Sequence, residues 1–296
     1  MRPGVITTAT LVEISSALLD KPGGFTSNDV SMPSMAFEHM LVVPDIPNWE
    51  FGVLTQVRDM ALAMRDDFSR SQSQSATDPD LVTAQIRFNT DSNLWLFPPA
   101  ESQFREGVDA LESYLQRLQN GEAQFYTRAD NLNNWLTKVQ RQMGALSIAL
   151  SASVGIRQVQ EEGAAMSIAD DDLQAPGVEL EVIDTAEGEQ AEVLVKTPRL
   201  KVDDVFYQAR GQTWAILHLL KAIEADFEDV LRQKNSLVSL RQIINKLEDA
   251  QEDVWSPIIL NGRGYSFVAN HSLVMASQIS RANAALIDLS RLMREG

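Results

Sequence analysis

The 296-residue chain contains no cysteine and only three histidines. The missing cysteine excludes disulfides, thiolate nucleophiles, cysteine zinc sites and iron–sulfur ligation. The three histidines, His39, His218 and His271, are far apart and have neither His-x-x-x-His nor His-Glu-x-x-His spacing, so a zinc hydrolase signature is absent. We therefore expect no metal site and no cofactor.

Motifs that commonly hold phosphates or nucleophiles are missing as well. The sequence has no Gly-x-x-x-x-Gly-Lys run, no Gly-x-Ser-x-Gly elbow and no serine three residues before a lysine. Neighbouring carboxylates occur at Asp66-Asp67 and Asp203-Asp204. Adjacent residues on a helix point to different sides, so we interpret these pairs as solvated or capping acids. The sequence thus favours a protein that is not an enzyme.

Long apolar runs are also missing. The longest uncharged stretch, residues 264–280, contains Asn270, His271 and Gln278 and is too short and too polar to span a bilayer. The first 19 residues include several threonines and serines instead of the apolar run of a secretory signal. The chain as given is expected to be soluble.

Negative charge is abundant but unevenly distributed. The 41 acidic and 25 basic residues give a net charge of −16, which opposes binding to nucleic acid or to an anionic membrane surface. Residues 158–195 alone carry 11 acidic residues and no basic residue. We therefore divide the chain into an N-terminal helical part (1–157), an acidic insertion or linker (158–195) and a C-terminal helical part (196–296). The two helical parts are expected to pack as one bundle.

Apolar residues recur every three or four positions over most of both helical parts, which is typical of amphipathic helices. The sequence therefore predicts an all-α fold, a multi-helix bundle of long amphipathic helices. The helices at about 104–118 and 127–154 follow one another closely, so we expect them to lie antiparallel with their apolar faces together. The expected helices cover residues 8–19, 49–68, 104–118, 127–154, 203–230, 237–247 and 272–293, with Asp203 as the N-cap of the fifth. Whether the fifth and sixth form one helix or two depends on residues 234–236.

Apolar and polar residues alternate in two segments, as they do in short strands. Residues 83–88 and 93–97 flank the polar run 89–92 and predict a small β-hairpin. Residues 178–183 and 191–195 alternate inside the acidic insertion, where an exposed hairpin competes with a flexible insertion. We favour the flexible insertion, because charges of one sign repel each other and keep a segment extended.

One loop is the best candidate for a ligand or partner site. Arg263 stands between two glycines, whose backbone is free to adopt positive φ, and next to an aromatic residue. Its guanidinium could hold a carboxylate or a phosphate, or close a helix end. The histidine at the start of the following helix could bind a ligand, or it could serve only to cap or pack that helix. The candidate residues are Asn261, Arg263, Tyr265 and His271.

Several longer strings resemble one known family. They include Leu19-Asp-Lys-Pro-Gly-Gly24, Asn48-Trp-Glu-Phe-Gly-Val53, Asp203-Asp-Val-Phe-Tyr207 and Trp255-Ser-Pro-Ile-Ile-Leu-Asn-Gly262. Together they are similar to a group of uncharacterised proteobacterial proteins catalogued only as a domain of unknown function. The resemblance spans nearly the whole chain outside the acidic insertion and brings no assigned activity. It implies one transmembrane segment ahead of the region where this chain begins, and hence a periplasmic domain behind an inner-membrane anchor.

The sequence and the resemblance together favour a non-catalytic cell-envelope domain that is membrane-tethered in its full-length form. Its expected partner is another envelope protein, bound through the helical faces, the acidic insertion or both. The alternative is a small-ligand-binding protein or an enzyme with a pocket between helices near Arg263 and His271. No nucleic acid is expected as a partner, and the membrane is expected to be reached only through an anchor absent from this chain.

Overall fold

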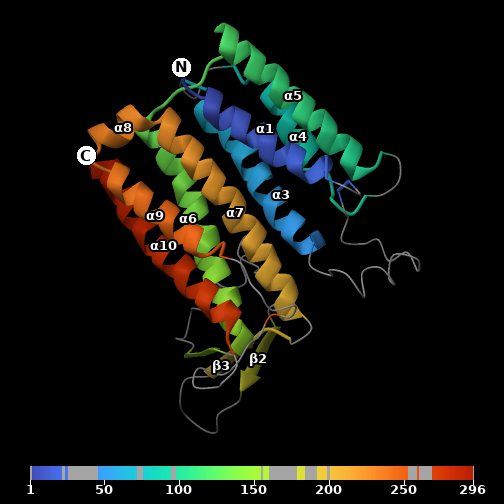
Figure 1. The fold of residues 1–296 in the computed structure, drawn as a ribbon, viewed down its shortest axis with the longest axis vertical. Coiled ribbons are helices and arrows are strands. Elements are labelled where there is room, and N and C mark those ends of the chain that lie inside the picture. The colour runs from blue at the N-terminus through green and yellow to red at the C-terminus, as the bar shows by residue number, and fades with distance from the viewer. Residues whose placement is uncertain are drawn as a thin grey trace.

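The computed structural model describes residues 2–21, 24–25, 46–71, 76–94, 98–154, 156–159, 179–183, 192–198, 201–252, 259 and 269–295. Within these ranges the chain forms a bundle of helices with a small sheet at one end (Figure 1), which confirms the predicted all-α class. The helices are α1 (Val5–Leu19), α3 (Ile46–Ala63), α4 (Pro79–Phe88), α5 (Ala100–Asn120), α6 (Ala129–Ser151), α7 (Val202–Asp226), α8 (Glu228–Gln233), α9 (Leu237–Asp249) and α10 (His271–Glu295). A π-helical turn (Met64–Phe68) continues α3, and a 3-10 turn (Ala152–Val154) follows α6.

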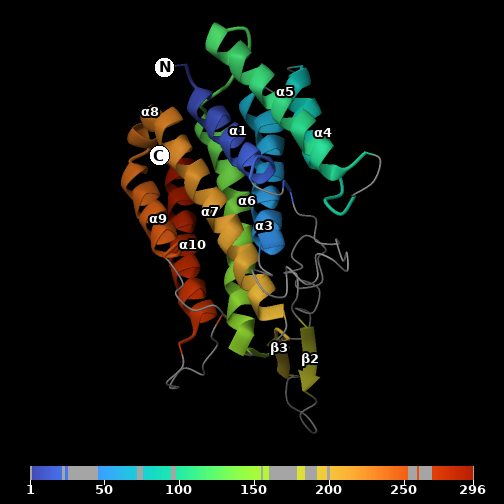
Figure 2. The same ribbon diagram turned by 45° about the vertical axis from the view of Figure 1, so that its right-hand side comes forward.

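The helices form three groups that lie side by side (Figures 1 and 2). Helices α3, α6 and α7 occupy the middle. On one side, α1 packs against α5, α7 and α3, and α4 packs against α5. On the other side, α10 packs against α6 and α9. The most extensive contacts therefore join helices that are distant in sequence, α3 with α7 and α6 with α10.

Helices α3 and α7 run parallel and touch at the level of their backbones. A β-carbon at Gly52 would lie 2.2 Å from the carbonyl oxygen of Gln208, and one at Gly211 would lie 2.0 Å from the carbonyl oxygen of Trp49. Both distances are far below van der Waals contact, so only glycine fits at either position. The rings of Trp49 and Trp214 pack against each other with centroids 5.2 Å apart.

The π-helical turn at the end of α3 is held by the start of α6 and by the connection that leads into it. A π-helical turn disturbs the regular pattern of backbone hydrogen bonds, and two of its carbonyls have partners outside the helix. The side-chain amide of Asn131 donates to the carbonyl oxygen of Asp67 at 2.7 Å, and the N–H of Tyr126 donates to that of Phe68 at 2.7 Å. The Phe68 ring packs against Phe125 and Phe227, which joins this turn to the end of α7.

A sheet of three antiparallel strands in the order β1-β3-β2 connects α6 to α7. Strand β1 (Ile156–Val159) and strand β2 (Glu179–Ile183) both pair with β3 (Glu192–Lys196). The two strands of the hairpin that we weighed for the acidic insertion are thus present as β2 and β3. Residues 160–178 and 184–191, which bear most directly on the flexible-insertion interpretation, lie outside the described residues.

The hairpin predicted at residues 83–88 and 93–97 is wrong, because residues 79–88 form helix α4. Asp78 caps this helix by accepting a hydrogen bond from the N–H of Asp80 at 3.0 Å, and Pro79 occupies its first turn. The buried side chains Leu81, Ala84 and Phe88 recur with helical spacing. Residues 95–97 lie outside the described residues.

The expected antiparallel pairing of the helices now identified as α5 and α6 is also wrong. In the described part of the chain, α5 packs against α4 and α1, whereas α6 packs against α10 and α7. The apolar face of α5 receives the side chains of α4, a helix that the sequence pattern did not reveal. A short connection therefore brought two helix ends together without bringing their apolar faces together.

The segment predicted as one or two helices after residue 203 forms three. Helix α7 ends at Asp226, the short helix α8 follows, and α9 begins at Leu237. Asn235 between α8 and α9 has a φ of 51°, in the left-handed region that asparagine tolerates better than most residues. This turn lets α9 return along α7 and pack against α10.

Candidate functional site

Of the four residues proposed as a site from the sequence, the structure describes only His271. It is the first residue of α10 and is partly buried. Its neighbour Asn270 supplies the helix cap, because the Asn270 Oδ1 accepts a hydrogen bond from the N–H of Leu273 at 2.8 Å. Asn261, Arg263 and Tyr265 lie outside the described residues. The pocket near Arg263 and His271 therefore stays a prediction.

A cluster of polar side chains lies where α3 and α7 begin and α1 ends. Glu50 on α3 has a fully buried side chain and forms an ion pair with Lys21, whose side chain is 25 % exposed. The ammonium group of Lys21 also donates to the carbonyl oxygen of Gly24. A buried carboxylate is unfavourable without a partner, so this ion pair fixes the end of α1 against α3.

The start of α7 makes a second polar contact with the start of α3, and two neighbouring acids lie there. The side-chain amide of Asn48 donates to Asp204 Oδ1 at 2.7 Å. Burial raises the pKa of Asp204 and of Asp203 above their ordinary values, and a hydrogen bond from the backbone of Ile259 partly offsets this effect at Asp203. The predicted capping role of Asp203 is wrong: α7 begins at Val202, so Asp203 lies in the first turn. Carboxylates there still interact favourably with the helix dipole.

Residues from three of the strings that carry the family resemblance form these two contacts, Lys21 with Glu50 and Asn48 with Asp204. One is an ion pair between an ammonium group and a carboxylate, and the other joins an amide to a carboxylate with raised pKa. Among the described residues, no three histidine, aspartate or glutamate side chains are placed to hold a metal ion. The arrangement therefore supports a structural role, in which polar contacts hold the ends of α1, α3 and α7 together.

A second polar group lies between α3, α6 and α7, and we call it the amide relay. The Nε2 of Gln142 donates to Asp59 Oδ2. The Nε2 of Gln56 donates to Gln142 Oε1 at 3.0 Å and to Gln212 Oε1 at 3.4 Å. Gln56 and Gln212 are 1 % and 6 % exposed, so the relay runs from the edge of the bundle at Asp59 into its centre. Sequence reasoning missed it, because single polar residues within amphipathic helices resemble surface positions.

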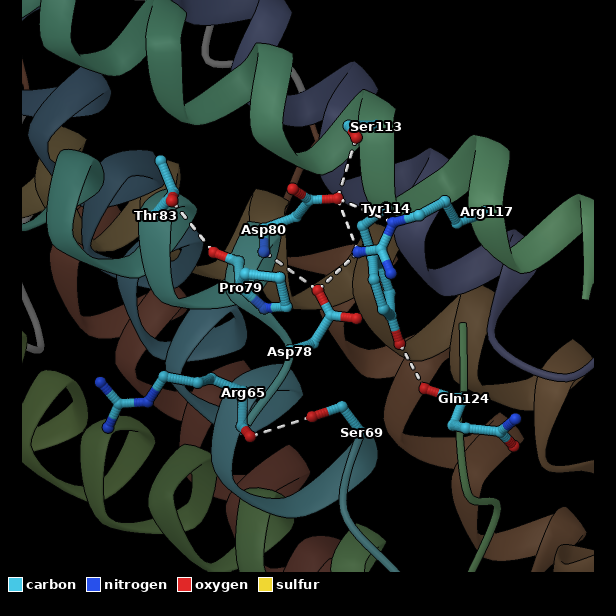
Figure 3. Close-up of polar contacts among 10 residues, drawn as sticks. All are labelled: Arg65, Ser69, Asp78, Pro79, Asp80, Thr83, Ser113, Tyr114, Arg117 and Gln124. Carbon is cyan, nitrogen blue, oxygen red and sulfur yellow. Dashed lines mark hydrogen bonds and ion pairs between the residues drawn. The ribbon is translucent and has the colours of Figure 1, made fainter. Parts of the chain in front are cut away.

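An ion cluster joins the start of α4 to the end of α5 (Figure 3). The guanidinium of Arg117 contacts Asp78 Oδ1 and Asp80 Oδ2, each at 2.6 Å, and Ser113 donates to Asp80 at 2.9 Å. Burial raises the pKa of the adjacent Tyr114 phenol, whose hydroxyl donates to the carbonyl oxygen of Gln124 at 2.6 Å. Every charge in this cluster already has a partner, so we assign it to stability.

The remaining candidates for acid–base chemistry also have structural partners. Asp66 pairs with Arg65, whereas Asp67 accepts from Asn134 at 3.0 Å, so the two carboxylates form no common site. His218 packs against the ring of Trp214 with centroids 4.6 Å apart, and burial lowers its pKa. A histidine whose ring meets an aromatic ring edge to face, and whose charged form is disfavoured by burial, is typical of a packed structural position.

The sequence model of one family, described as "Uncharacterized protein conserved in bacteria (DUF2333)", matches residues 1–296. The chain belongs to this family. The resemblance to a domain of unknown function is thereby confirmed, and the DUF2333 match includes the acidic residues 158–195. No curated protein and no solved structure matched the chain. None of the described helices of this DUF2333 chain is long and apolar enough to cross a membrane.

Proposed function

We propose that this chain is the non-catalytic binding domain of a cell-envelope protein, which a segment ahead of α1 tethers to the inner membrane on its periplasmic side. In this proposal, residues 158–195 bind another envelope protein whose contact surface is basic. Eleven acidic residues without one basic residue create a strong local negative potential. Such a potential steers a basic partner toward the segment and disfavours acidic competitors.

The observation that carries this proposal is how the two ends of the acidic segment join the bundle. Strand β1 follows α6 and pairs with β3, which precedes α7, with Ile156 opposite Val195. Next to this pair, the N–H of Thr197 donates to the carbonyl oxygen of Ala152 at 3.0 Å. The segment therefore leaves and rejoins the bundle at one place, and a partner can bind it without separating helices.

The position of the sheet is also favourable for a tethered domain. The N-terminus lies at the end of the bundle opposite to β2 and β3 (Figure 2). Helix α7 has 25 residues and runs between these ends, which corresponds to about 38 Å at 1.5 Å per residue. That length is several times the Debye length of about 8 Å at physiological ionic strength. A tether ahead of α1 would thus keep the acidic segment away from anionic lipid headgroups.

The binding proposal is tested with the native full-length protein and two variants. The first converts all acidic residues of the segment to their amides. The second, a control, converts the exposed acids Glu112, Asp229 and Asp288 on the helices to amides. The first variant changes Glu161, Glu162, Asp170, Asp171, Asp172, Glu179, Glu181, Asp184, Glu187, Glu189 and Glu192.

A partner captured from envelope extract is identified by mass spectrometry, purified and titrated against each protein. We expect the segment variant to bind at least tenfold more weakly, the control to bind like the wild type, and added salt to weaken wild-type binding. Equal affinity of the segment variant would overturn the role of the segment. Protease treatment of spheroplasts tests the location separately, because a periplasmic domain is cleaved while the inner membrane is intact.

A further inference from the structure

In the amide relay, the buried Oε1 of Gln56 has no hydrogen-bond partner, and the charge of Asp59 explains why. An ionised carboxylate at Asp59 can only accept hydrogen bonds, so Gln142 must turn its NH2 group toward Asp59 and its oxygen toward Gln56. Gln56 must then present its own NH2 group, which donates to both Gln142 and Gln212. The charge of Asp59 at the edge of the bundle thus determines which atom of the Gln56 amide has no hydrogen-bond partner at the centre.

A protonated Asp59 removes this constraint, because its hydroxyl can donate to Gln142 Oε1. Rotation of the three terminal amides by about 180° then lets the NH2 groups of Gln142 and Gln212 donate to Gln56 Oε1. The two orientations of a glutamine amide occupy nearly the same volume, so the reversal needs no movement of α3, α6 or α7. In the first state the Oε1 of Gln56 has no partner, and in the reversed state its NH2 group has none. Only the reversed state requires a proton on Asp59, so ionisation of Asp59 excludes it.

We propose that Asp59 and these three glutamines form a proton-controlled relay, in which protonation of Asp59 reverses the direction of every hydrogen bond from α6 through α3 to α7. Through this relay the interior of the bundle senses the pH at its surface. The inference is independent of the proposed binding function, because it depends only on contacts within the bundle.

Burial is the largest effect on Asp59 and raises the pKa of its carboxyl above the ordinary value. The hydrogen bond from Gln142 is the largest opposing effect, and the cations of Lys138 on α6 and Arg58 on α3 also favour the ionised form. The Arg58 guanidinium already donates to the carbonyl oxygens of Phe88 and Thr90 and lies near Asp91. From α7, the neutral Gln212 contacts the relay through Gln56.

Side-chain NMR of the whole chain tests the relay directly. With amide nitrogens of glutamine labelled with 15N, and aspartate carboxyls with 13C, resonances are followed as the pH is lowered from 7 to 4. We expect the Gln56 NH2 resonances to move upfield together with the titration of the Asp59 carboxyl, because this group loses both acceptors. The Gln212 NH2 resonances should move downfield with the same midpoint, because that group gains an acceptor.

Two variants separate a relay from a general response of the protein to pH. Gln142→Met interrupts the chain, so Asp59 should still titrate while Gln56 and Gln212 no longer follow it. Asp204→Asn removes a comparable carboxylate that also accepts from an amide, and it should leave the Gln56 titration unchanged. Thermal unfolding at pH 7 verifies that both variants are folded. If the wild-type Gln56 and Gln212 resonances do not move while Asp59 titrates, the relay does not exist.

Discussion

The carboxylate of Asp226, the last residue of α7, caps helix α1 through Thr7. Its Oδ2 accepts from the Thr7 N–H at 2.6 Å and from the Thr7 hydroxyl at 2.7 Å. Gly4, which precedes α1, provides no capping side chain. An acceptor from a helix more than 200 residues away therefore satisfies a free N–H in the first turn of α1 and interacts with the positive end of its dipole.

Replacing Asp226 should therefore destabilise the fold. We expect Asp226→Ala to lower the free energy of unfolding by about 1–2 kcal/mol, the usual range for a lost helix cap. Urea denaturation measures this change. Asp229→Ala, at an exposed position on α8, is the matched control and should stay within about 0.5 kcal/mol of the wild type. A double-mutant cycle with Thr7→Val should recover the coupling between the two residues; simple additivity would contradict the contact.

The close contact of α3 and α7 at their glycines predicts that replacing glycine by alanine has opposite effects on stability at two helical positions. At Gly211 an added methyl group meets the Trp49 backbone, which cannot shift without moving α3. We expect Gly211→Ala to cost about 1–3 kcal/mol or more. At Gly144 on α6 the nearest atom would be the Asn283 Nδ2 at 3.5 Å, an ordinary contact. Gly144→Ala should therefore stabilise the protein by about 0.5–1 kcal/mol through its better helix propensity.

Thermal unfolding of the two alanine variants side by side checks this prediction. Because both changes add one methyl group to a helical glycine, general effects of alanine cancel in the comparison. Similar midpoints for Gly211→Ala and Gly144→Ala would show that α3 and α7 are not in backbone contact.

The raised pKa of Asp59 predicts how stability depends on pH. The folded state holds the Asp59 proton more tightly than the unfolded state. Between the unfolded and the folded pKa, the contribution of this group to stability is therefore lost as the pH rises. Asp59→Asn does not titrate, so its stability relative to the wild type should increase from pH 4 to pH 7. Urea denaturation at fixed pH values measures the difference.

The control for the Asp59 experiment is Asp130→Asn, which removes one negative charge from a side chain that is 83 % exposed. Subtracting its pH profile isolates the effect of burial at Asp59. A constant difference between Asp59→Asn and the wild type over this pH range would contradict the raised pKa.

The ion cluster predicts a larger effect for a partly buried arginine than for an exposed one. Arg117 neutralises Asp78 and Asp80, and the Asp78 side chain is only 13 % exposed. Arg117→Met leaves these carboxylates close together without their cation, so we expect a loss of about 2 kcal/mol. Arg105→Met removes ion pairs that are largely exposed on both sides and should cost at most about 0.5 kcal/mol. Equal losses in denaturation experiments would place the cluster among ordinary surface pairs.

The long helices could be predicted because their buried residues follow the period of a helix without interruption. In α5, for example, Phe104, Val108, Leu111 and Leu118 are all buried. Helix α4 was missed because it is short and because Ile86 breaks the apparent period. Its side chain is 58 % exposed, so it produced an alternation that imitates a strand. Burial, which the sequence alone does not report, distinguishes these two patterns.

The polar interior was not predictable in the same way. Lys21 with Glu50 and Gln56 with Gln212 become partners only when helices dock, and no local pattern relates residues so far apart in the chain. One signal was available: Gly52 and Gly211 interrupt helices where glycine costs about 1 kcal/mol relative to alanine. Glycine in such a position often marks a close approach of two helices. Sequence reasoning did not use it.

The backbone contacts that Gly52 makes with Gln208, and Gly211 with Trp49, join the polypeptide on either side of the acidic segment. Helices α3 and α6 come from the N-terminal side, and α7 and α10, their main packing partners, come from the C-terminal side. Cleavage of the chain between residues 160 and 178 would therefore break one covalent link while leaving these interfaces intact. The two fragments should then remain together as a tight heterodimer and behave as one particle until a denaturant separates them.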